Sequence, residues 1–394
     1  MRVVIALASH SAQLSGVERH AINLSRALLL QDEIQQVHLV GAPWQQELLQ
    51  GSLIDHDARL SLHAALLGRS AWQRNMWYYH RLPEIAAKLG ADIVHLAYPM
   101  PVKRGAFPCP TVVSLHDLYP YVVPENFGFP RVLVNRIVLR QCLNTAQAIA
   151  CVSRSTYFDL FNLYPKLAQT KASIIPNSVE PPTTLPFRGA EERWGSAPFL
   201  LCVAQHRPNK NILLALRIFR RLLSETRIPS TTRLFVVGIT GPETSRIKDF
   251  IASSGLTDRV VLASGLSDYE LQWLYRRCEV LLAPSTAEGF GLPVVEALLV
   301  GCRIVCSSIP AHREFGEGHC HFVSMGPEDE DRFMESTIAA LAERKPAAVT
   351  LPHLTPGRIG QSYLDLYRNL VAHGISSQQH PYPLPIQKKG HALP

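Results

Sequence analysis

The sequence predicts an α/β protein in which two Rossmann-like, doubly wound parallel-sheet domains face an interdomain cleft. The chain has 394 residues, about twice the length of one ordinary domain. Short apolar runs bounded by turn residues alternate with amphipathic stretches, as expected for repeated strand–helix–strand units. The proline-rich residues 175–186 separate two sets of these runs and continue neither a helix nor a sheet. We expect this segment to be the hinge.

The apolar runs indicate where the strands lie. In the first half of the chain they are residues 3–7, 93–96, 111–115 and 148–152, and in the second half 199–203, 234–237, 260–262, 280–283 and 303–306. Open α/β sheets bind ligands beyond the carboxyl ends of their strands. Functional residues are therefore expected in the loops that follow these runs.

We place the first domain at residues 1–180 and the second at 181–355. Residues 356–372 have the apolar spacing of an amphipathic helix, which we expect to cross back to the first domain. The apolar positions of this helix are Ile359, Tyr363, Leu364, Leu366, Tyr367 and Leu370. Residues 375–394 contain four prolines and little apolar periodicity, so we expect a mobile tail.

Several patterns bear on location and metal binding. No apolar run is long enough to span a bilayer, and residues 1–8 are more typical of a buried strand than of a secretory signal. The eight cysteines are scattered through apolar segments, which favours a reducing cytoplasm. Cys302, Cys306 and the His-Cys-His of residues 319–321 match no common zinc spacing, so we expect no metal site.

The net charge of +7 lies mostly in the first half of the chain. Residues 1–190 contain 17 Lys and Arg against 12 Asp and Glu, an excess of +5. An anionic membrane surface, a pyrophosphate-bearing acceptor or a nucleic acid would suit such a bias, and a solvated surface without a partner is the alternative. No basic and aromatic platform recurs at stacking spacing, so no nucleic-acid partner is expected.

The most specific motif is EGFGLPVVE at residues 288–296, which follows a strand. Gly289 and Gly291 allow the backbone to approach a ligand and present its amides, and Pro293 indicates the start of a helix. These amides, with the positive end of the helix, suit a diphosphate. Glu288 and Glu296, the latter expected in the first helical turn, can accept hydrogen bonds from sugar hydroxyls. The alternative for Glu296 is an acid that only stabilises the helix start.

This motif resembles the Glu-x7-Glu motif of glycosyltransferase family 4, and the flanking LLAPSTAEGFGLP and EALLVGCRIVCSSIPAHRE are also similar to that family. The resemblance extends over nearly the whole chain and implies a GT-B fold. It implies that Glu288 binds hydroxyls of the donor hexose and that Glu296 binds the ribose. The amides of Phe290, Gly291 and Leu292 would meet the sugar and the phosphates.

Residues 205–211, Gln-His-Arg-Pro-Asn-Lys-Asn, form a second cluster after the strand at 199–203. Lys210 is the preferred cation for neutralising the departing diphosphate, and Arg207 is a substitute for the arginine that commonly precedes this lysine in the family. The sequence has Ala204-Gln205 at about the place of the family's Gly-Arg. The alternative is an exposed basic turn.

The N-terminal half contributes two loops. His116 and Asp117 follow the strand at 111–115, and the family has a histidine there that faces the donor sugar. Asp117 is expected to orient His116 or to shape the acceptor site, and a structural histidine is the alternative. Gly16 precedes a Glu-Arg-His similar to the family's, but Ser15 replaces a glycine. Gly16 would permit close approach of a phosphate or acceptor at a helix start.

Two further loops match the family less specifically. Gly238 and residues 264–266, which include Leu266, lie where family members contact the nucleotide base, although both also suit ordinary turns. Ser153 and Ser155 are expected to cap a helix.

The resemblance thus implies a retaining hexosyltransferase whose N-terminal domain faces the acceptor and whose C-terminal domain binds a nucleotide-sugar. HRPNKN resembles mannosyltransferase-like members of the family, which implies GDP-mannose as the first donor, followed by a UDP-hexose. The expected acceptor is a saccharide or lipid-linked saccharide for surface polysaccharide or glycolipid synthesis. No cofactor or metal is expected to be required. A nucleotide-sugar epimerase and a non-catalytic GT-B subunit are the alternatives. The basic N-terminal half is consistent with peripheral association at the cytoplasmic face of a membrane.

Overall fold

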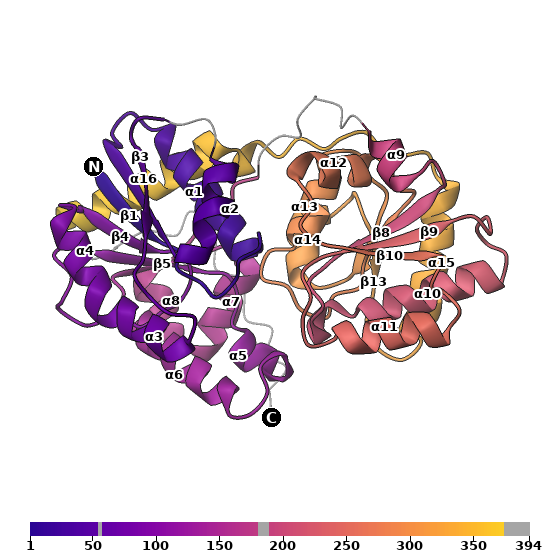
Figure 1. Ribbon diagram of the computed structural model, residues 1–394, viewed down its shortest axis with the longest axis horizontal. Helices are drawn as coiled ribbons and strands as arrows, with labels where there is room; N and C mark the ends of the chain where they lie inside the picture. The colour runs from indigo at the N-terminus through magenta and orange to yellow at the C-terminus, as the bar shows by residue number, and fades with distance from the viewer. Residues whose placement is uncertain (54–56, 180–188, 374–394) are drawn as a thin grey trace.

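The computed structural model describes residues 1–53, 57–179 and 189–373. It contains a seven-stranded sheet of order β3-β2-β1-β4-β5-β6-β7 and a six-stranded sheet of order β10-β9-β8-β11-β12-β13. All strand pairs are parallel, and in each sheet the strand order reverses beside the first strand, β1 or β8. Figure 1 shows the two sheets with their covering helices next to each other. The predicted pair of doubly wound domains is therefore confirmed.

The first sheet is built from residues in the N-terminal half. Its strands are β1 Arg2–Ala6, β2 Gln36–Gly41, β3 Leu60–Ala64, β4 Ile93–Leu96, β5 Thr111–Leu115, β6 Ala148–Cys151 and β7 Ala172–Ile174. The accompanying helices are α1 Gly16–Leu29, α2 Gln46–Ser52, α3 Ala71–Met76, α4 Leu82–Lys88, α5 Tyr119–Val122, α6 Arg131–Thr145, α7 Arg154–Leu163 and α8 Pro165–Lys171. The short 3₁₀ helices η1 Pro43–Gln45 and η3 Pro124–Asn126 and the π-helix η2 Trp77–Arg81 complete this half.

The second sheet follows the same scheme. Its strands are β8 Phe199–Val203, β9 Arg233–Val237, β10 Val260–Ala263, β11 Leu281–Ala283, β12 Ile304–Ser307 and β13 His321–Val323. The helices are α9 Ala190–Trp194, α10 Ile212–Ser224, α11 Thr244–Ser253, α12 Asp268–Arg277, α13 Leu292–Leu298, α14 Pro310–Gly316 and α15 Asp329–Ala342, with η4 Pro208–Lys210 and η5 Pro352–Leu354.

Each of the nine strands named from the sequence is present, with ends that differ by at most one residue. The apolar runs located them because these strands are buried on both faces. Strands β2, β3, β7 and β13 were not among those named. β3 and β13 are edge strands with partly exposed side chains, so their patterns are weaker.

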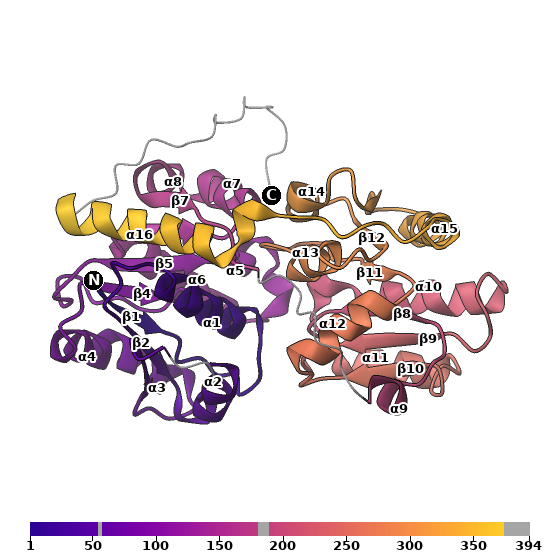
Figure 2. The same ribbon diagram turned by 90° about the horizontal axis from the view of Figure 1, so that it is seen from above.

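The last helix, α16 (Pro356–His373), lies against the N-terminal sheet domain although it follows the second sheet in the chain. Figure 2 shows it crossing over to the side of β1, β4 and β5. The six apolar positions read from the sequence are all buried in the core that α16 shares with α1. Gly360 allows the two helices to approach closely, because a Cβ there would lie 2.0 Å from the carbonyl oxygen of Ala27.

A buried polar network fixes α16 and the start of the hinge to the first sheet. His95 on β4 contacts Tyr367 Oη through Nδ1 (2.6 Å) and Ser114 Oγ through Nε2 (2.8 Å). His20 on α1 contacts the same Ser114 Oγ (2.7 Å) and, through Nδ1, Asn177 Oδ1 (2.8 Å). The chain therefore satisfies these buried polar groups with one another, as a dry interior requires.

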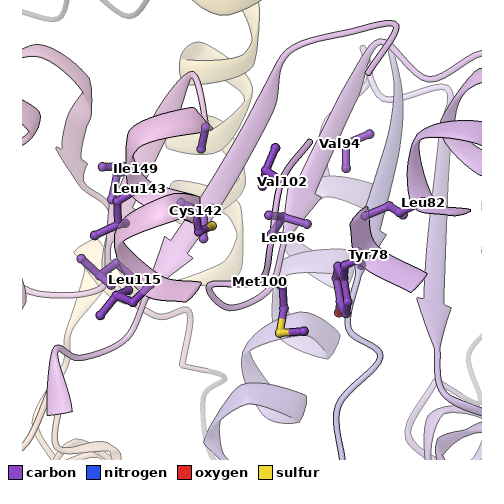
Figure 3. Packing of buried hydrophobic residues seen from close by; sticks show 14 of the residues in the cluster. Tyr78, Leu82, Val94, Leu96, Met100, Val102, Leu115, Cys142, Leu143 and Ile149 are labelled. Carbon is purple, nitrogen blue, oxygen red and sulfur yellow. The ribbon is translucent and has the colours of Figure 1, made fainter. Parts of the chain in front are cut away.

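A second hydrophobic core lies on the opposite face of the first sheet from α1 and α16, and α6 packs against it. Figure 3 shows Cys142 and Leu143 of α6 packed towards Leu115 and Ile149 of the strands. This packing fixes α6 through one face only.

The predicted hinge begins within the described residues, with Ile175 buried and Val179 donating its backbone N–H to the carbonyl of Leu354 (3.0 Å). Its remainder, residues 180–186, lies outside the described residues, as do the predicted tail at 375–394 and the ends of the two domains proposed at 180 and 181. No helix in the described part of the chain is long and apolar enough to cross a membrane.

We predict that acid weakens the fold through the buried histidines. Burial lowers the pKa of His95 to about 3, against 6.5 for an unperturbed histidine. Below pH 6.5 the unfolded chain therefore binds a proton that the folded chain excludes, and stability falls by about 1.4 kcal/mol per pH unit for each such proton. The drop in thermal midpoint between pH 7 and pH 5 should be smaller for His95→Gln than for the wild type.

The exposed His319 provides the matched control. His319→Gln should show the same drop in midpoint as the wild type. An unchanged drop in His95→Gln would contradict the assignment.

Candidate active site

A cavity of about 300 Å³ lies between the carboxyl ends of the two sheets. It is lined by loops of both domains, and every site residue named from the sequence contributes to its wall. These are Gly16, His116, Arg207, Lys210, Gly238, Leu266, Glu288, Gly289, Phe290, Gly291, Leu292 and Glu296. The structure thus brings together residues that are up to 280 positions apart in the chain.

Lys210 and Glu288 form an ion pair at the C-terminal side of the cavity. Lys210 Nζ donates to Glu288 Oε2 at 2.6 Å, and both side chains are largely shielded from solvent. Burial raises the pKa of Glu288, but the charges of Lys210 and His312 and the hydrogen bond from Lys210 outweigh it, so the net pKa lies below the usual range. Glu288 is therefore an ionised acceptor beside a cation, which suits a ligand with both hydroxyls and phosphates.

Glu296 lies one residue beyond the first turn of α13, because the helix begins at Leu292. The expected position in the first turn is therefore wrong, and the favourable placement of an acid at a helix start does not account for Glu296. Tyr275 Oη donates to Glu296 Oε2 at 2.9 Å. Burial raises the pKa of Glu296, and the positive charge of Arg19 opposes that rise.

Arg19 comes from α1 of the opposite domain, and Arg19 Nη1 lies 2.7 Å from Asp268 Oδ1 at the start of α12. It also lines the cavity. Sequence reasoning noted the Glu-Arg-His of residues 18–20 but gave Arg19 no role. The folded chain uses the three side chains differently: buried Glu18 accepts from the backbone N–H of Ser15 at 3.1 Å and so closes the first loop, whereas His20 belongs to the polar network.

The glycine loop of the motif packs backbone to backbone against the N-terminal domain. A Cβ on Gly289 would lie 1.8 Å from the carbonyl oxygen of His116, so only glycine fits this contact. Ser153 Oγ donates to the carbonyl oxygen of Gly289, and Thr156 Oγ1 lies 3.1 Å from the same atom and 3.0 Å from the His116 carbonyl oxygen. Gly291 is in the left-handed region, with φ of 82°, and forms the N-cap of α13.

His116 donates through Nε2 to the carbonyl oxygen of Ala97 at 2.8 Å, which leaves Nδ1 as the acceptor nitrogen of the neutral ring. Burial lowers its pKa, so the neutral form is favoured. Asp117 accepts from the backbone N–H of Tyr119 at 3.0 Å, and burial raises the pKa of this carboxyl. The partner that orients the His116 ring is therefore Ala97. The expectation that Asp117 orients this ring is wrong because its carboxylate turns to the next loop, whereas its expected part in shaping the acceptor site stays a prediction.

Arg207 is the N-cap of the turn η4 that follows β8, and Lys210 is the last residue of this turn. Asn209 attaches this turn to the motif segment, because its Nδ2 donates to the carbonyl of Ala287 at 2.9 Å. Asn126 of the N-terminal domain donates to Asn209 Oδ1 at 3.0 Å. The turn is thus fixed on both sides of the cleft, and the alternative of an unattached basic turn does not describe it.

The remaining predicted positions have local explanations as well as a place in the cavity wall. Gly238 lies against β8, where a Cβ would be 1.9 Å from the carbonyl oxygen of Ala204, so chain crowding requires glycine there. Leu266 packs partly into the second domain's core. Gly16 is the first residue of α1 and has open space around its Cβ position.

Ser153 caps α7 as expected, since its side chain accepts from the backbone N–H of Thr156 at 2.9 Å. Ser155 lies inside α7, so its predicted capping role is wrong. Glu314 of the second domain instead accepts from the backbone N–H groups of Arg154 (3.0 Å) and Ser155 (3.3 Å) at the start of this helix.

Four of the cysteines form two pairs of neighbouring thiols. Cys302 Sγ lies 3.2 Å from Cys278 Sγ, whereas Cys306 interacts with Cys320. All eight cysteines are free thiols. Within residues 1–53, 57–179 and 189–373, no three His, Cys, Asp or Glu side chains are arranged to hold a metal ion.

Comparison with known families identifies the fold and the class of reaction. Residues 14–181 match the family described as Glycosyltransferase Family 4, and residues 187–348 match the one described as Glycosyl transferases group 1. The chain belongs to glycosyltransferase family 4. It is a GT-B enzyme of this family, with one sheet domain under each match.

Individual relatives of this glycosyltransferase are consistent with the family. It is 27% identical to the O-antigen chain mannosyltransferase B of Escherichia coli over 329 residues, which cover 78% of this chain and 83% of that protein. It is 25% identical to the O-antigen chain mannosyltransferase RfbU of Salmonella typhimurium over 238 residues, which cover 60% of this chain and 62% of the relative.

Among solved structures, the sucrose-phosphate synthase of Thermosynechococcus elongatus superposes with a TM-score of 0.71 at 17% identity. The superposition covers 94% of this chain and 99% of the other. At this identity the likeness shows the shared fold alone.

We predict that Glu288→Ala and Lys210→Ala each lower the glycosyl-transfer rate by about 100-fold, because each removes one member of the charged pair in the cavity. Transfer is measured as product formed from a nucleotide-sugar, and folding by thermal unfolding. Glu317→Ala, an exposed acid outside the cavity, is the control. Wild-type rates in both cavity variants would refute their roles.

A second prediction concerns the interdomain contact. Gly289→Ala places a methyl group against the His116 carbonyl, so the loop or a whole domain must shift. The transfer rate should fall by about tenfold or more, because displacements of about 1 Å can cost that much. Gly357→Ala, on α16 with open space around its Cβ, should keep the wild-type rate. Equal rates in the two variants would show that the contact does not set the site geometry.

Proposed function

We propose that the protein is a retaining hexosyltransferase that moves mannose from GDP-mannose to a saccharide or lipid-linked saccharide in surface polysaccharide or glycolipid synthesis. The observation that carries this proposal is the ion pair of Lys210 and Glu288 beside the glycine loop, in a cavity lined by both domains. The two bacterial relatives named as O-antigen chain mannosyltransferases favour mannose and a polysaccharide acceptor.

The cavity wall suggests how the donor lies. Ionised Glu288 would accept hydrogen bonds from hydroxyls of the hexose, and Glu296 would accept those of the ribose. Arg207 and Lys210 would meet the diphosphate, together with the amides of the glycine loop. Because α13 has only seven residues, its dipole is small. We therefore expect these side chains and amides to contribute more to diphosphate binding than the helix dipole does.

Arg19 has a defined place in this arrangement. Its charge opposes the burial-induced rise in the pKa of Glu296 and so favours the ionised form, which can accept hydrogen bonds from two hydroxyls. Its ion pair with Asp268 also links α1 to α12 across the cleft. Donor binding and domain approach would therefore be coupled through one side chain.

The proposed chemistry is a front-face substitution. The bond between the anomeric carbon and the diphosphate oxygen breaks, and the diphosphate leaves with the electron pair. The acceptor hydroxyl forms the new bond on the same face, and its proton passes to the departing diphosphate. Lys210 and Arg207 would stabilise the charge that develops on the leaving group. His116, with its neutral ring held by Ala97, would face the hexose rather than act as a charged acid.

Two cationic side chains at the diphosphate position would fill the electrostatic role that a divalent ion has in other transferases. We therefore propose that the reaction needs no metal or other cofactor. We also propose that the enzyme works at the cytoplasmic face of a membrane, where a lipid-linked acceptor would be presented.

A donor panel tests the proposal. Purified protein is incubated with GDP-mannose, GDP-glucose, UDP-glucose and UDP-galactose, each with a lipid-linked saccharide acceptor, in parallel reactions without and with EDTA. GDP-mannose should give the highest transfer rate, and NMR of the product should show the anomeric configuration of the donor. A UDP-hexose giving the highest rate would replace GDP-mannose, and an altered free sugar nucleotide without product would indicate an epimerase. Inversion would refute the mechanism, and loss of activity in EDTA would refute the metal independence.

A further inference from the structure

We propose that the outward face of α6, together with Phe129 just before it, docks the enzyme onto an anionic lipid bilayer. The proposal names the surface that would carry the membrane association put forward above. Only the biological reason for docking, access to a lipid-linked acceptor, rests on the proposed function. The docking itself is argued from α6 and its surroundings.

Helix α6 is apolar on both faces, which is unusual for a helix at the surface of a globular domain. Its inner face packs Leu139, Cys142 and Leu143 into the core of the N-terminal domain (Figure 3). Its outer face carries exposed apolar side chains at the spacing of one helical stripe. These are Leu133, Val134 and Ile137, which with Phe129 are between 45 and 83% exposed.

This surface accounts for four of the ten large apolar side chains that are exposed in the described residues. Exposed large apolar side chains scattered singly need no explanation, whereas a contiguous group marks a site of contact. The four lie within nine positions of the chain, on one stripe of a single helix and the residue leading into it. They therefore form a patch and not a scatter.

Charge selects the partner of this patch. Helix α6 carries three arginines, Arg131, Arg136 and Arg140, and no acidic residue. Arg131 and Arg140 are exposed, whereas Arg136 turns inwards, donating to the carbonyl of Pro120 at 2.7 Å. Exposed arginines beside an exposed apolar stripe complement an anionic bilayer, with the stripe among the acyl chains and the guanidinium groups at the headgroups.

A second exposed segment in the same domain has matching chemistry. Leu66 and Trp72 are 89 and 70% exposed. Arg69, which lies between them in the sequence, stacks over the ring of Trp44. Tryptophan favours the membrane interface because its ring is both apolar and a hydrogen-bond donor. Figure 1 shows α3, which carries Trp72, along the same lower edge of the domain as α5 and α6.

The chain connects this patch directly to the cavity. His116, Asp117 and Tyr119 line the cavity wall, and the chain then runs through α5 and η3 into α6. Asn126, between the wall and the patch, contacts Asn209 of the second domain. The cavity wall and the patch thus belong to one continuous stretch of the N-terminal domain, on which a bilayer-held acceptor would be presented.

The test is flotation of the full chain with vesicles, without donor or acceptor. One vesicle is phosphatidylcholine alone, and the other contains about one third phosphatidylglycerol, whose negative surface potential attracts basic segments. The wild type should bind the anionic vesicles. The triple variant Phe129→Ser, Leu133→Ser, Ile137→Ser should bind at least about tenfold more weakly, because it removes the groups that insert.

Two further variants separate the contributions. Arg131→Gln with Arg140→Gln should reduce the preference for anionic over neutral vesicles by about tenfold. Leu30→Ser with Val371→Ser changes two equally exposed apolar side chains outside α6 and should leave binding unchanged. Thermal unfolding checks that all variants fold.

Binding of the triple variant that equals the wild type would overturn the proposal. Sedimentation showing a wild-type dimer that the triple variant converts to a monomer, with no vesicle binding, would also overturn it and assign the face to a second copy of the chain. Nucleotide release from the donor is measured in parallel with a water-soluble acceptor. Failure of all donors with intact vesicle binding would refute the proposed function and leave the docking surface standing.

Discussion

The contact between the glycine loop and the carbonyl of His116 is the constraint on which the site depends. Both sheets are parallel, so the loops that follow their strands lie at the edges that face each other. The cavity forms because the backbone at Gly289 fits directly against the N-terminal domain, with Ser153 and Thr156 holding its carbonyl. A side chain at this position would separate the domains and widen the space between the acids on one side and His116 on the other.

Burial of charge is the second constraint, and the chain meets it differently for its two motif acids. Glu288 has Lys210 at hydrogen-bond distance, and the pair keeps its pKa low despite burial. Glu296 has a tyrosine hydroxyl and a more distant arginine, and its pKa is raised. The two carboxylates are therefore not equivalent, which accords with the different parts of a nucleotide-sugar proposed for them.

The network of His20, Ser114 and His95 connects the catalytic face to the rest of the domain. It joins α1, β5 and β4 to α16 and reaches the start of the hinge at Asn177. The His20 ring also lies against His116, with ring centroids 4.7 Å apart. A movement of the hinge at Asn177 would therefore change the position of His20 and, through it, of His116 in the cavity wall. Helix α6 lies on the other face of the sheet, where it is available for the proposed membrane contact.

Local patterns in the chain were sufficient for the two-sheet architecture and for most strands. The positions in the cavity wall were named from the motifs together with their resemblance to glycosyltransferase family 4. Buried strands read as apolar runs, and the spacing of Glu288, the glycines and Glu296 reflects chemistry confined to one short loop and helix. The partners of these residues required folding in three dimensions. Arg19 is 277 positions from Glu296, Ala97 replaces Asp117 as the partner of His116, and Glu314 caps a helix of the other domain. Such contacts depend on how the two domains pack, and no periodicity or spacing along the chain records that packing.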